Sequence, residues 1–178
     1  MKPKVLSLTL TALFAVITVL CSMISVPAAI PFTLQTFGIF LSLFVLGGKY
    51  GTLSITVYIL LGAVGLPVFH GFTGGVGTLA SSTGGYIIGF ILSDLVYMLI
   101  TKLAGESSKA KLISAFIGLI LCYIAGTLWF TVTSSQGNGF SSALLTCVVP
   151  FIIPDTIKIL LAFFISQRLK KINRLNAV

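Results

Sequence analysis

Three charged residues lie inside otherwise apolar stretches of this 178-residue chain: Asp94, Asp155 and Lys158. A charge within the hydrocarbon core of a bilayer costs at least about 2.5–3.5 kcal/mol, so each of them needs a partner or a function. On a helix, Asp155 and Lys158 are i, i+3 neighbours that can point the same way. They form either a self-neutralising structural pair or a recognition site, where the carboxylate accepts N–H donors and the ammonium meets an anionic or carbonyl group. Asp94 is interpreted as structural, because a proton relay would need further titratable partners.

An uncharged, glycine-rich loop between residues 65 and 86 contains further candidate binding residues. Its seven glycines permit positive φ angles and a close approach of the backbone to a ligand. Phe69, Thr73 and Tyr86 are the residues of this loop that we expect at the ligand, with the aromatic rings as apolar walls. His70, the sole histidine, forms neither a metal site nor a catalytic triad alone and is expected near solvent.

Gln35 is the one amide of an earlier uncharged loop, and it can present two donors and an acceptor to a urea-like or amide group. The three cysteines, Cys21, Cys122 and Cys147, lack the spacing of metal ligands and are expected to be small packing residues. We therefore predict a substrate-binding protein with no catalytic residue, no metal and no cofactor.

The elements that must position these residues are membrane helices. The chain is 57% hydrophobic and 8% charged, with a mean hydropathy of +1.15, whereas soluble domains place charge on about a quarter of their residues. About 20 apolar residues cross a bilayer as a helix, so 1–178 should form a single transmembrane substrate-binding domain without room for an ATPase. The fold class is an all-α membrane protein. Six spans are expected, at 5–25, 36–48, 51–64, 84–103, 111–133 and 142–168.

The distribution of basic residues predicts the orientation of these six helices. Ten of the eleven lysines and arginines fall on one side when the connections are numbered alternately, and the loops of the other side carry no charge. The positive-inside rule then places both termini in the cytoplasm of a multi-pass cell-membrane protein. Because the basic residues lie at helix ends and form no stripe with aromatics, nucleic acid is not an expected partner.

The sequence contains no nucleotide-binding motif, so any ATP-driven step would require partner proteins. Helices associate within lipid through small side chains at i, i+4 spacing. The first helix offers such a face in Ser7, Thr11, Ala12 and Ala15, which we expect to be the partner-docking surface.

Three segments closely resemble the BioY family, which comprises the biotin-specific S components of energy-coupling factor (ECF) transporters: Pro31-Phe-Thr-Leu-Gln-Thr-Phe37, Gly65-Leu-Pro-Val-Phe69 with the glycines up to Thr83-Gly-Gly-Tyr86, and Pro150-Phe-Ile-Ile-Pro-Asp155-Thr-Ile-Lys158. The resemblance implies a six-helix protein that captures biotin from outside. It also implies an ECF module of one membrane protein and two ATPases that drives release inward. Asp155 and Lys158 match the family's polar pair near the vitamin, and Tyr86 and Gln35 stand in matched loops. S components resemble one another in an Ala-x-x-x-Ala patch on the first helix, where this chain has Ala12 and Val16.

Three other functions are alternatives to this one. An S component for another vitamin stays in the same class, although a cationic thiamine would favour acidic residues over a lysine. A small intramembrane enzyme would need a Ser–His pair, a metal cluster or a carboxylate dyad. A stand-alone proton-coupled carrier would use Asp94 and Asp155. Which end of biotin Lys158 contacts stays open, because its charge suits the carboxylate and its adjacency to Asp155 suits a clamp on the ureido ring.

Overall fold

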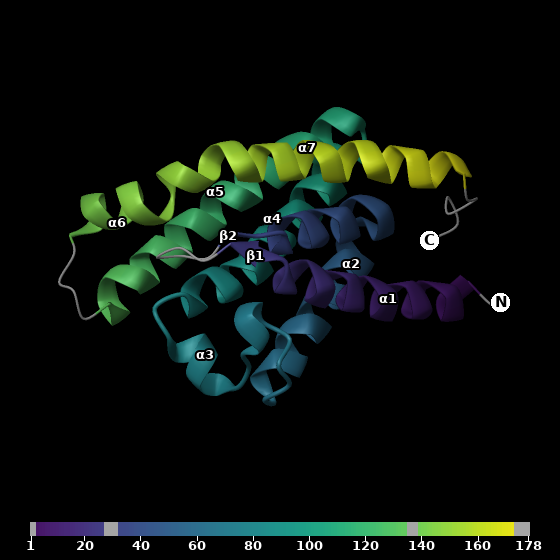
Figure 1. The fold of residues 1–178 in the computed structure, drawn as a ribbon. Helices are drawn as coiled ribbons and strands as arrows, with labels where there is room; N and C mark the ends of the chain where they lie inside the picture. The colour runs from purple at the N-terminus through teal and green to yellow at the C-terminus, as the bar shows by residue number, and fades with distance from the viewer. Residues whose placement is uncertain (1–2, 27–31, 135–138, 173–178) are drawn as a thin grey trace.

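The computed structural model describes residues 3–26, 32–134 and 139–172, and this part of the chain is almost entirely helical (Figure 1). Pro31 of the first resembling segment lies outside the described residues, as do Lys2 and Arg174, two of the ten basic residues counted above. The helices are α1 (Pro3–Met23), α2 (Gln35–Ala63), α3 (Val76–Ala80), α4 (Gly84–Ala104), α5 (Ser108–Thr133), α6 (Phe140–Cys147) and α7 (Val149–Ile172). A 3-10 turn, η1 (His70–Phe72), precedes α3, and the two-residue strands β1 (Ser25–Val26) and β2 (Phe32–Thr33) pair antiparallel.

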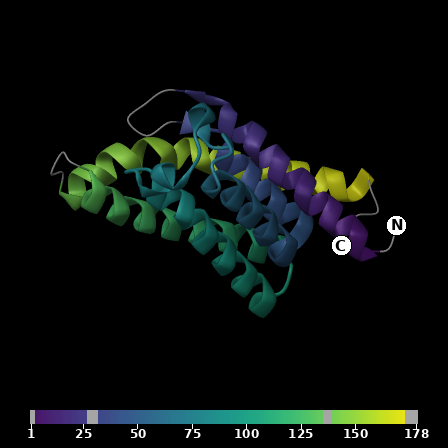
Figure 2. The same ribbon diagram turned by 90° about the horizontal axis from the view of Figure 1, so that it is seen from below.

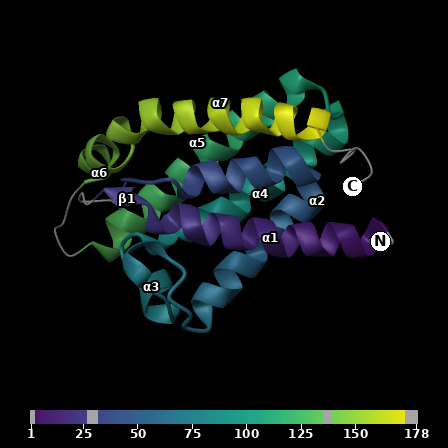
Figure 3. The same cartoon turned by 45° about the vertical axis from the view of Figure 1, so that its right-hand side comes forward.

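Five of the described helices are long and apolar enough to cross a membrane: α1, α2, α4, α5 and α7. The expected spans at 36–48 and 51–64 both fall within α2, which is broken at Gly47. There φ is 77° and ψ is 174°, a backbone conformation that essentially only glycine adopts. The two parts of α2 run in different directions from this bend (Figure 3). They also pack tightly, because a Cβ added to Gly51 would lie 2.8 Å from the Cα of Leu43.

The described helices form one bundle in which α2 is central. It contacts α1, α4 and α7, and α5 packs along α4. The middle of the bundle is aromatic, because the Phe44 ring meets the rings of Tyr97 and Phe163 edge to face, at centroid distances of 5.9 and 5.4 Å. Large apolar side chains also cover much of the outer surface, as expected for a protein that faces lipid.

The helix ends are segregated by charge. The start of α1, the bend of α2, the α4–α5 connection and the end of α7 lie toward one end of the bundle (Figures 1 and 2). We call this the basic end, because the described lysines and arginines other than Lys158 belong to these segments: Lys4, Lys49, Lys102, Lys109, Lys111, Arg168, Lys170 and Lys171. The hairpin β1–β2 and helices α3 and α6 lie toward the opposite end (Figures 1 and 2).

The small-residue face of α1 differs from expectation. Ser7, Thr11 and Ala15 are buried, and of the four residues expected to dock a partner only Ala12 is exposed. The same stripe continues to Thr18, whose Cα would lie 3.1 Å from a Cβ added to Gly38 of α2. Small side chains permit close helix approach inside a bundle as well as between proteins, and here they pack α1 against α2.

Candidate binding site

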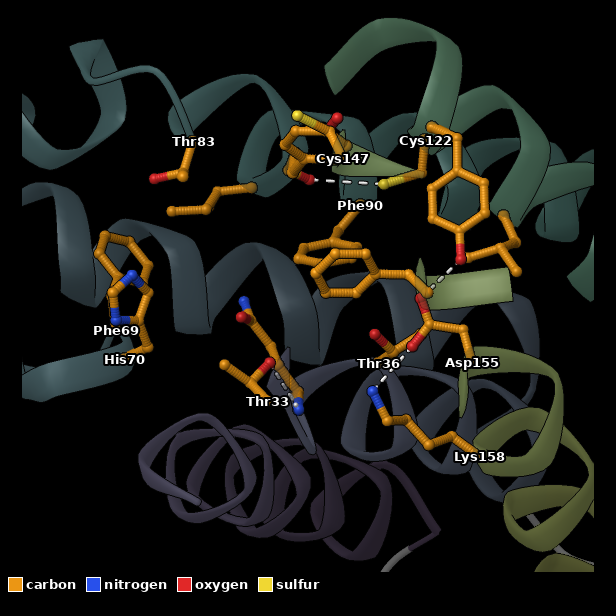
Figure 4. Close-up of a pocket in the computed structure, with 16 residues that line it drawn as sticks. Thr33, Thr36, Phe69, His70, Thr83, Phe90, Cys122, Cys147, Asp155 and Lys158 are labelled. Carbon is orange, nitrogen blue, oxygen red and sulfur yellow. Dashed lines mark hydrogen bonds and ion pairs between the residues drawn. The ribbon is translucent and has the colours of Figure 1, made fainter. Parts of the chain in front are cut away.

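A pocket lies between the helices (Figure 4). Its lining residues at the starts of α2, α4 and α7 place it toward the end opposite the basic end. Five of the six residues expected at a substrate line it: Gln35, Phe69, Tyr86, Asp155 and Lys158. Thr73 is not among the lining residues. Its exposed side chain donates a hydrogen bond to the carbonyl oxygen of His70, at 2.9 Å. These five residues come from four separate segments of the chain, which converge on one cavity.

The two charged side chains of the pocket and one tyrosine hydroxyl form a group of three residues. Lys158 Nζ donates to Asp155 Oδ1 at 2.8 Å, and the Tyr123 hydroxyl donates to Asp155 Oδ2 at 2.7 Å. Asp155 is 4% exposed and Lys158 is 9% exposed, so both charges are removed from bulk solvent. A lysine ammonium carries three N–H donors and each carboxylate oxygen accepts more than one hydrogen bond, so the group retains donors and acceptors for a ligand.

The polar groups at Gln35 and Tyr86 are held by neighbouring side chains. Gln35 Nε2 donates to the Tyr58 hydroxyl at 3.0 Å, and the Tyr86 hydroxyl lies 3.1 Å from Thr127 Oγ1. The first bond joins the two parts of α2, and the second joins α4 to α5. Both side chains are therefore positioned before any ligand arrives.

Aromatic rings form part of the pocket wall. Phe151 of α7 lines the pocket and stacks on Phe32 of β2, with centroids 4.1 Å apart and planes 11° apart. Phe69 is buried and meets the Tyr58 ring edge to face at 5.5 Å. A Cβ on Gly62 would overlap the Phe69 ring, so only glycine at this position allows the ring to pack against α2. The apolar lining suits a ligand with an apolar body.

The glycine-rich loop is fixed to the bundle at several points. Ser22 of α1 donates to the Val68 carbonyl at 2.6 Å, and the Gly75 amide donates to the Gly62 carbonyl at 2.7 Å. Trp129 Nε1 of α5 donates to the Ser81 carbonyl at 2.9 Å. These bonds make the loop a fixed wall of the pocket.

His70 lies in the loop, as expected, and also lines the pocket. It is half-buried, and burial lowers the pKa of its imidazole, so the neutral ring prevails at pH 7. His70 and Phe69 lie on one side of the pocket, and Asp155 and Lys158 lie on the other (Figure 4). The cavity is therefore elongated, with a charged group at one end and a neutral imidazole at the other.

Several lining residues were missed by the sequence reasoning. Tyr123 is one of them, and it donates to Asp155. Its hydroxyl is the only one from a tyrosine in the apolar run 111–133, which indicates a buried hydrogen-bond partner. Cys122 and Cys147 were expected to be packing residues, and both also line the pocket. Thr36 and Phe151 lie in two of the segments that carry the family resemblance, but their place at the pocket depends on how α2 and α7 meet.

Asp94 is fully buried outside this pocket, and neither of its carboxylate oxygens has a hydrogen-bond partner among the described residues. Lys158 forms its ion pair with Asp155, and neither of the Asp94 oxygens is bonded to it. The hydroxyl of Thr101 donates to the Tyr97 carbonyl.

A bundle of apolar helices around an elongated, largely apolar pocket with one ion pair defines a membrane-embedded protein that binds a small molecule. Within the described residues no group of histidine, cysteine, aspartate or glutamate side chains could hold a metal ion. The family model of BioY matches residues 1–174, and the chain belongs to the BioY family.

Individual relatives agree with this assignment. A biotin transporter BioY of Thermotoga maritima is 42% identical over 161 residues, which are 90% of this chain and 93% of that protein. A probable biotin transporter BioY of Pyrococcus horikoshii is 38% identical over 169 residues, covering 94% of this chain and 98% of that protein. The crystal structure of the S-component for biotin from an ECF-type ABC transporter superposes with a TM-score of 0.84 at 28% identity, covering 94% of this chain and 92% of that one.

Proposed function

We propose that this chain is the biotin-binding S component of an ECF-type vitamin transporter. It captures biotin from the extracellular side, and a separate ECF module drives uptake with ATP. The observation that carries the proposal is the buried group of Tyr123, Asp155 and Lys158 at one end of an aromatic pocket. The descriptions of the relatives as biotin transporters support the choice of biotin over another vitamin.

The arrangement of the pocket favours one orientation of biotin. Because Lys158 is neutralised by Asp155 at 2.8 Å, this end suits a neutral group better than a second carboxylate. The ureido ring offers two N–H donors and a carbonyl, so Asp155 can accept from an N–H while Lys158 donates to the carbonyl. The apolar bicycle and chain then lie along the aromatic rings, and the carboxylate reaches the end near His70.

We further propose six membrane spans within a single domain of residues 1–178, with both termini in the cytoplasm of the cell. The bend at Gly47 supports the count, because each part of α2 can be a separate, short crossing. The gathering of basic residues at the ends of α1, α4, α5 and α7 supports the orientation, because the positive-inside rule assigns that end to the cytoplasm.

The partner in this proposal is an ECF module of one transmembrane coupling protein and two ATPases. Ala12 supports a docking surface on the outer face of α1, since it is exposed there between Leu8 and Val16. Ser7, Thr11 and Ala15 are buried on a helix that packs against α2, so we leave these three out of the proposed surface.

Equilibrium binding of labelled biotin to the purified protein tests the proposal. Saturable binding that unlabelled biotin displaces, and that thiamine and riboflavin do not displace, is the expected result. Displacement by either of the other vitamins at equal concentration would contradict biotin specificity. Uptake into vesicles without the ATPases, driven by a pH gradient, would instead favour a stand-alone carrier.

A further inference from the structure

A second cavity lies at the basic end, between the bend of α2 and the end of α4. Its lining residues are Gly48, Lys49, Met98, Leu99, Thr101, Lys102 and Glu106. It shares no residue with the pocket described above. We call it the basic-end cleft.

Two lysine ammonium groups of this cleft are available to an anion. Lys49 and Lys102 are exposed, and neither forms an ion pair with any residue of the described chain. Lys49 lies over the ring of Tyr50, with Nζ 5.7 Å from the centroid. The ring carries no negative charge, so the ammonium can still bind an anion.

The acidic residue of the cleft is already neutralised. Glu106 Oε2 accepts a hydrogen bond from Lys111 Nζ at 2.9 Å. This bond lowers the pKa of the Glu106 carboxyl, so the carboxylate stays ionised at neutral pH and offsets a lysine charge. Among the residues that line the cleft, the charges without an anionic partner are those of Lys49 and Lys102.

One wall of the cleft continues as an apolar surface along α4. Leu99 lines the cleft and is exposed, and Leu95 and Leu103 are exposed one helical turn to either side of it. In a membrane-spanning helix these three side chains face lipid. The cleft thus combines two free ammonium groups at the membrane surface with a hydrocarbon-compatible wall.

We propose that the basic-end cleft binds an anionic phospholipid, with the phosphate between Lys49 and Lys102 and an acyl chain along Leu99 and Leu95. Free phosphate would use the lysines but not the leucines, so the apolar wall favours a lipid. Juxtamembrane lysines attract anionic lipid, and pockets between helices on the cytoplasmic side bind such headgroups. This inference does not depend on the proposed function, because lipid binding is measured without biotin.

The test is native mass spectrometry of the purified full chain in detergent, titrated with phosphatidylglycerol or with zwitterionic phosphatidylcholine. Phosphatidylglycerol should bind at lower concentration. The double variant Lys49→Gln/Lys102→Gln should lose roughly thirtyfold in phosphatidylglycerol affinity, the effect expected of two lysines near an anionic headgroup. Lys49→Arg/Lys102→Arg should retain it.

The matched control is Lys109→Gln/Lys171→Gln, which removes two exposed lysines of the same end outside the cleft. An equal loss in this control would overturn the proposal, because net charge alone would then explain binding. If millimolar inorganic phosphate displaced phosphatidylglycerol, the lipid proposal would be overturned and the cleft assigned to a phosphate ion. A glutamine variant that kept its lipid affinity but no longer co-purified with the ATPase module would assign the cleft to a protein interface. The replaced side chains are exposed, so the variants should fold, and circular dichroism checks this. Each single glutamine variant should lose part of the phosphatidylglycerol affinity.

Discussion

The hydroxyl of Tyr123 donates a 2.7 Å hydrogen bond to Asp155, at the carboxylate oxygen that the neighbouring lysine leaves free. This bond joins α5 to α7 across the pocket. It holds the carboxylate in one orientation, because its two oxygens are then bound by partners on different helices. Preorganisation of this kind makes Tyr123 a positioning residue for the charged group and a suitable target for mutation.

Tyr123→Phe should weaken biotin binding roughly tenfold, because a hydrogen bond to a charged group is removed while the ring remains. Equilibrium dialysis with labelled biotin measures the loss. Tyr50→Phe, which removes a hydroxyl outside the pocket, should bind normally. Equal affinity of the Tyr123 variant and the parent protein would show that Asp155 is held without this bond.

Lys158→Ala should weaken biotin binding at least roughly thirtyfold, because truncation leaves the buried Asp155 carboxylate without its cationic partner. Lys171→Ala, an exposed lysine at the far end of the same helix, is the matched control. Isothermal titration calorimetry on both variants gives the comparison. Unchanged affinity in folded Lys158→Ala protein would remove this residue from the site.

The orientation of biotin can be tested with ligand analogues. Methylation of a ureido nitrogen removes a donor that we assign to Asp155, so affinity should fall by more than about a hundredfold. The methyl ester of biotin alters only the end assigned to His70, and we expect it to lose less than about tenfold. The opposite ranking in a competition assay would place the carboxylate at Lys158.

Membrane topology can be tested by thiol labelling in a background without Cys21, Cys122 and Cys147. Because Cys122 and Cys147 line the pocket, that background is first checked for biotin binding. A cysteine at Thr73 should react with a membrane-impermeant reagent applied outside intact cells. A cysteine at Ser107, in the α4–α5 connection, should react only after the cells are permeabilised. Reversed labelling would contradict the orientation that we infer from the charges.

The outer face of α1 can be tested with two alanines of opposite exposure. Ala12→Trp should prevent co-purification with the ECF module and leave biotin binding by the isolated chain within a fewfold of normal, because this position is exposed. Ala15→Trp should instead lower the midpoint of thermal unfolding, because Ala15 is buried against its neighbours. Normal assembly of the Ala12 variant would direct the search for the docking surface to another helix.

The sequence alone determined the features that depend on local composition. Apolar runs predicted the membrane helices, and the expected spans at 36–48 and 51–64 meet close to the break that the structure places at Gly47. The i, i+3 spacing of Asp155 and Lys158 predicted that the two could meet, and they are 2.8 Å apart. The gathering of basic residues at one end follows from the same alternation of long apolar runs and short charged connections.

The tertiary structure alone decided which face of each helix points inward. In water a helix buries its apolar stripe, but in lipid both faces are apolar, so the pattern of α1 could not show that Ser7, Thr11 and Ala15 pack inside while Ala12 faces outward. Local sequence patterns also could not predict contacts between segments that are far apart in the chain. The stack of Phe32 on Phe151, the place of His70 at the pocket and the bond from Tyr123 each join residues on separate elements, and only the packing of the helices brings such residues together.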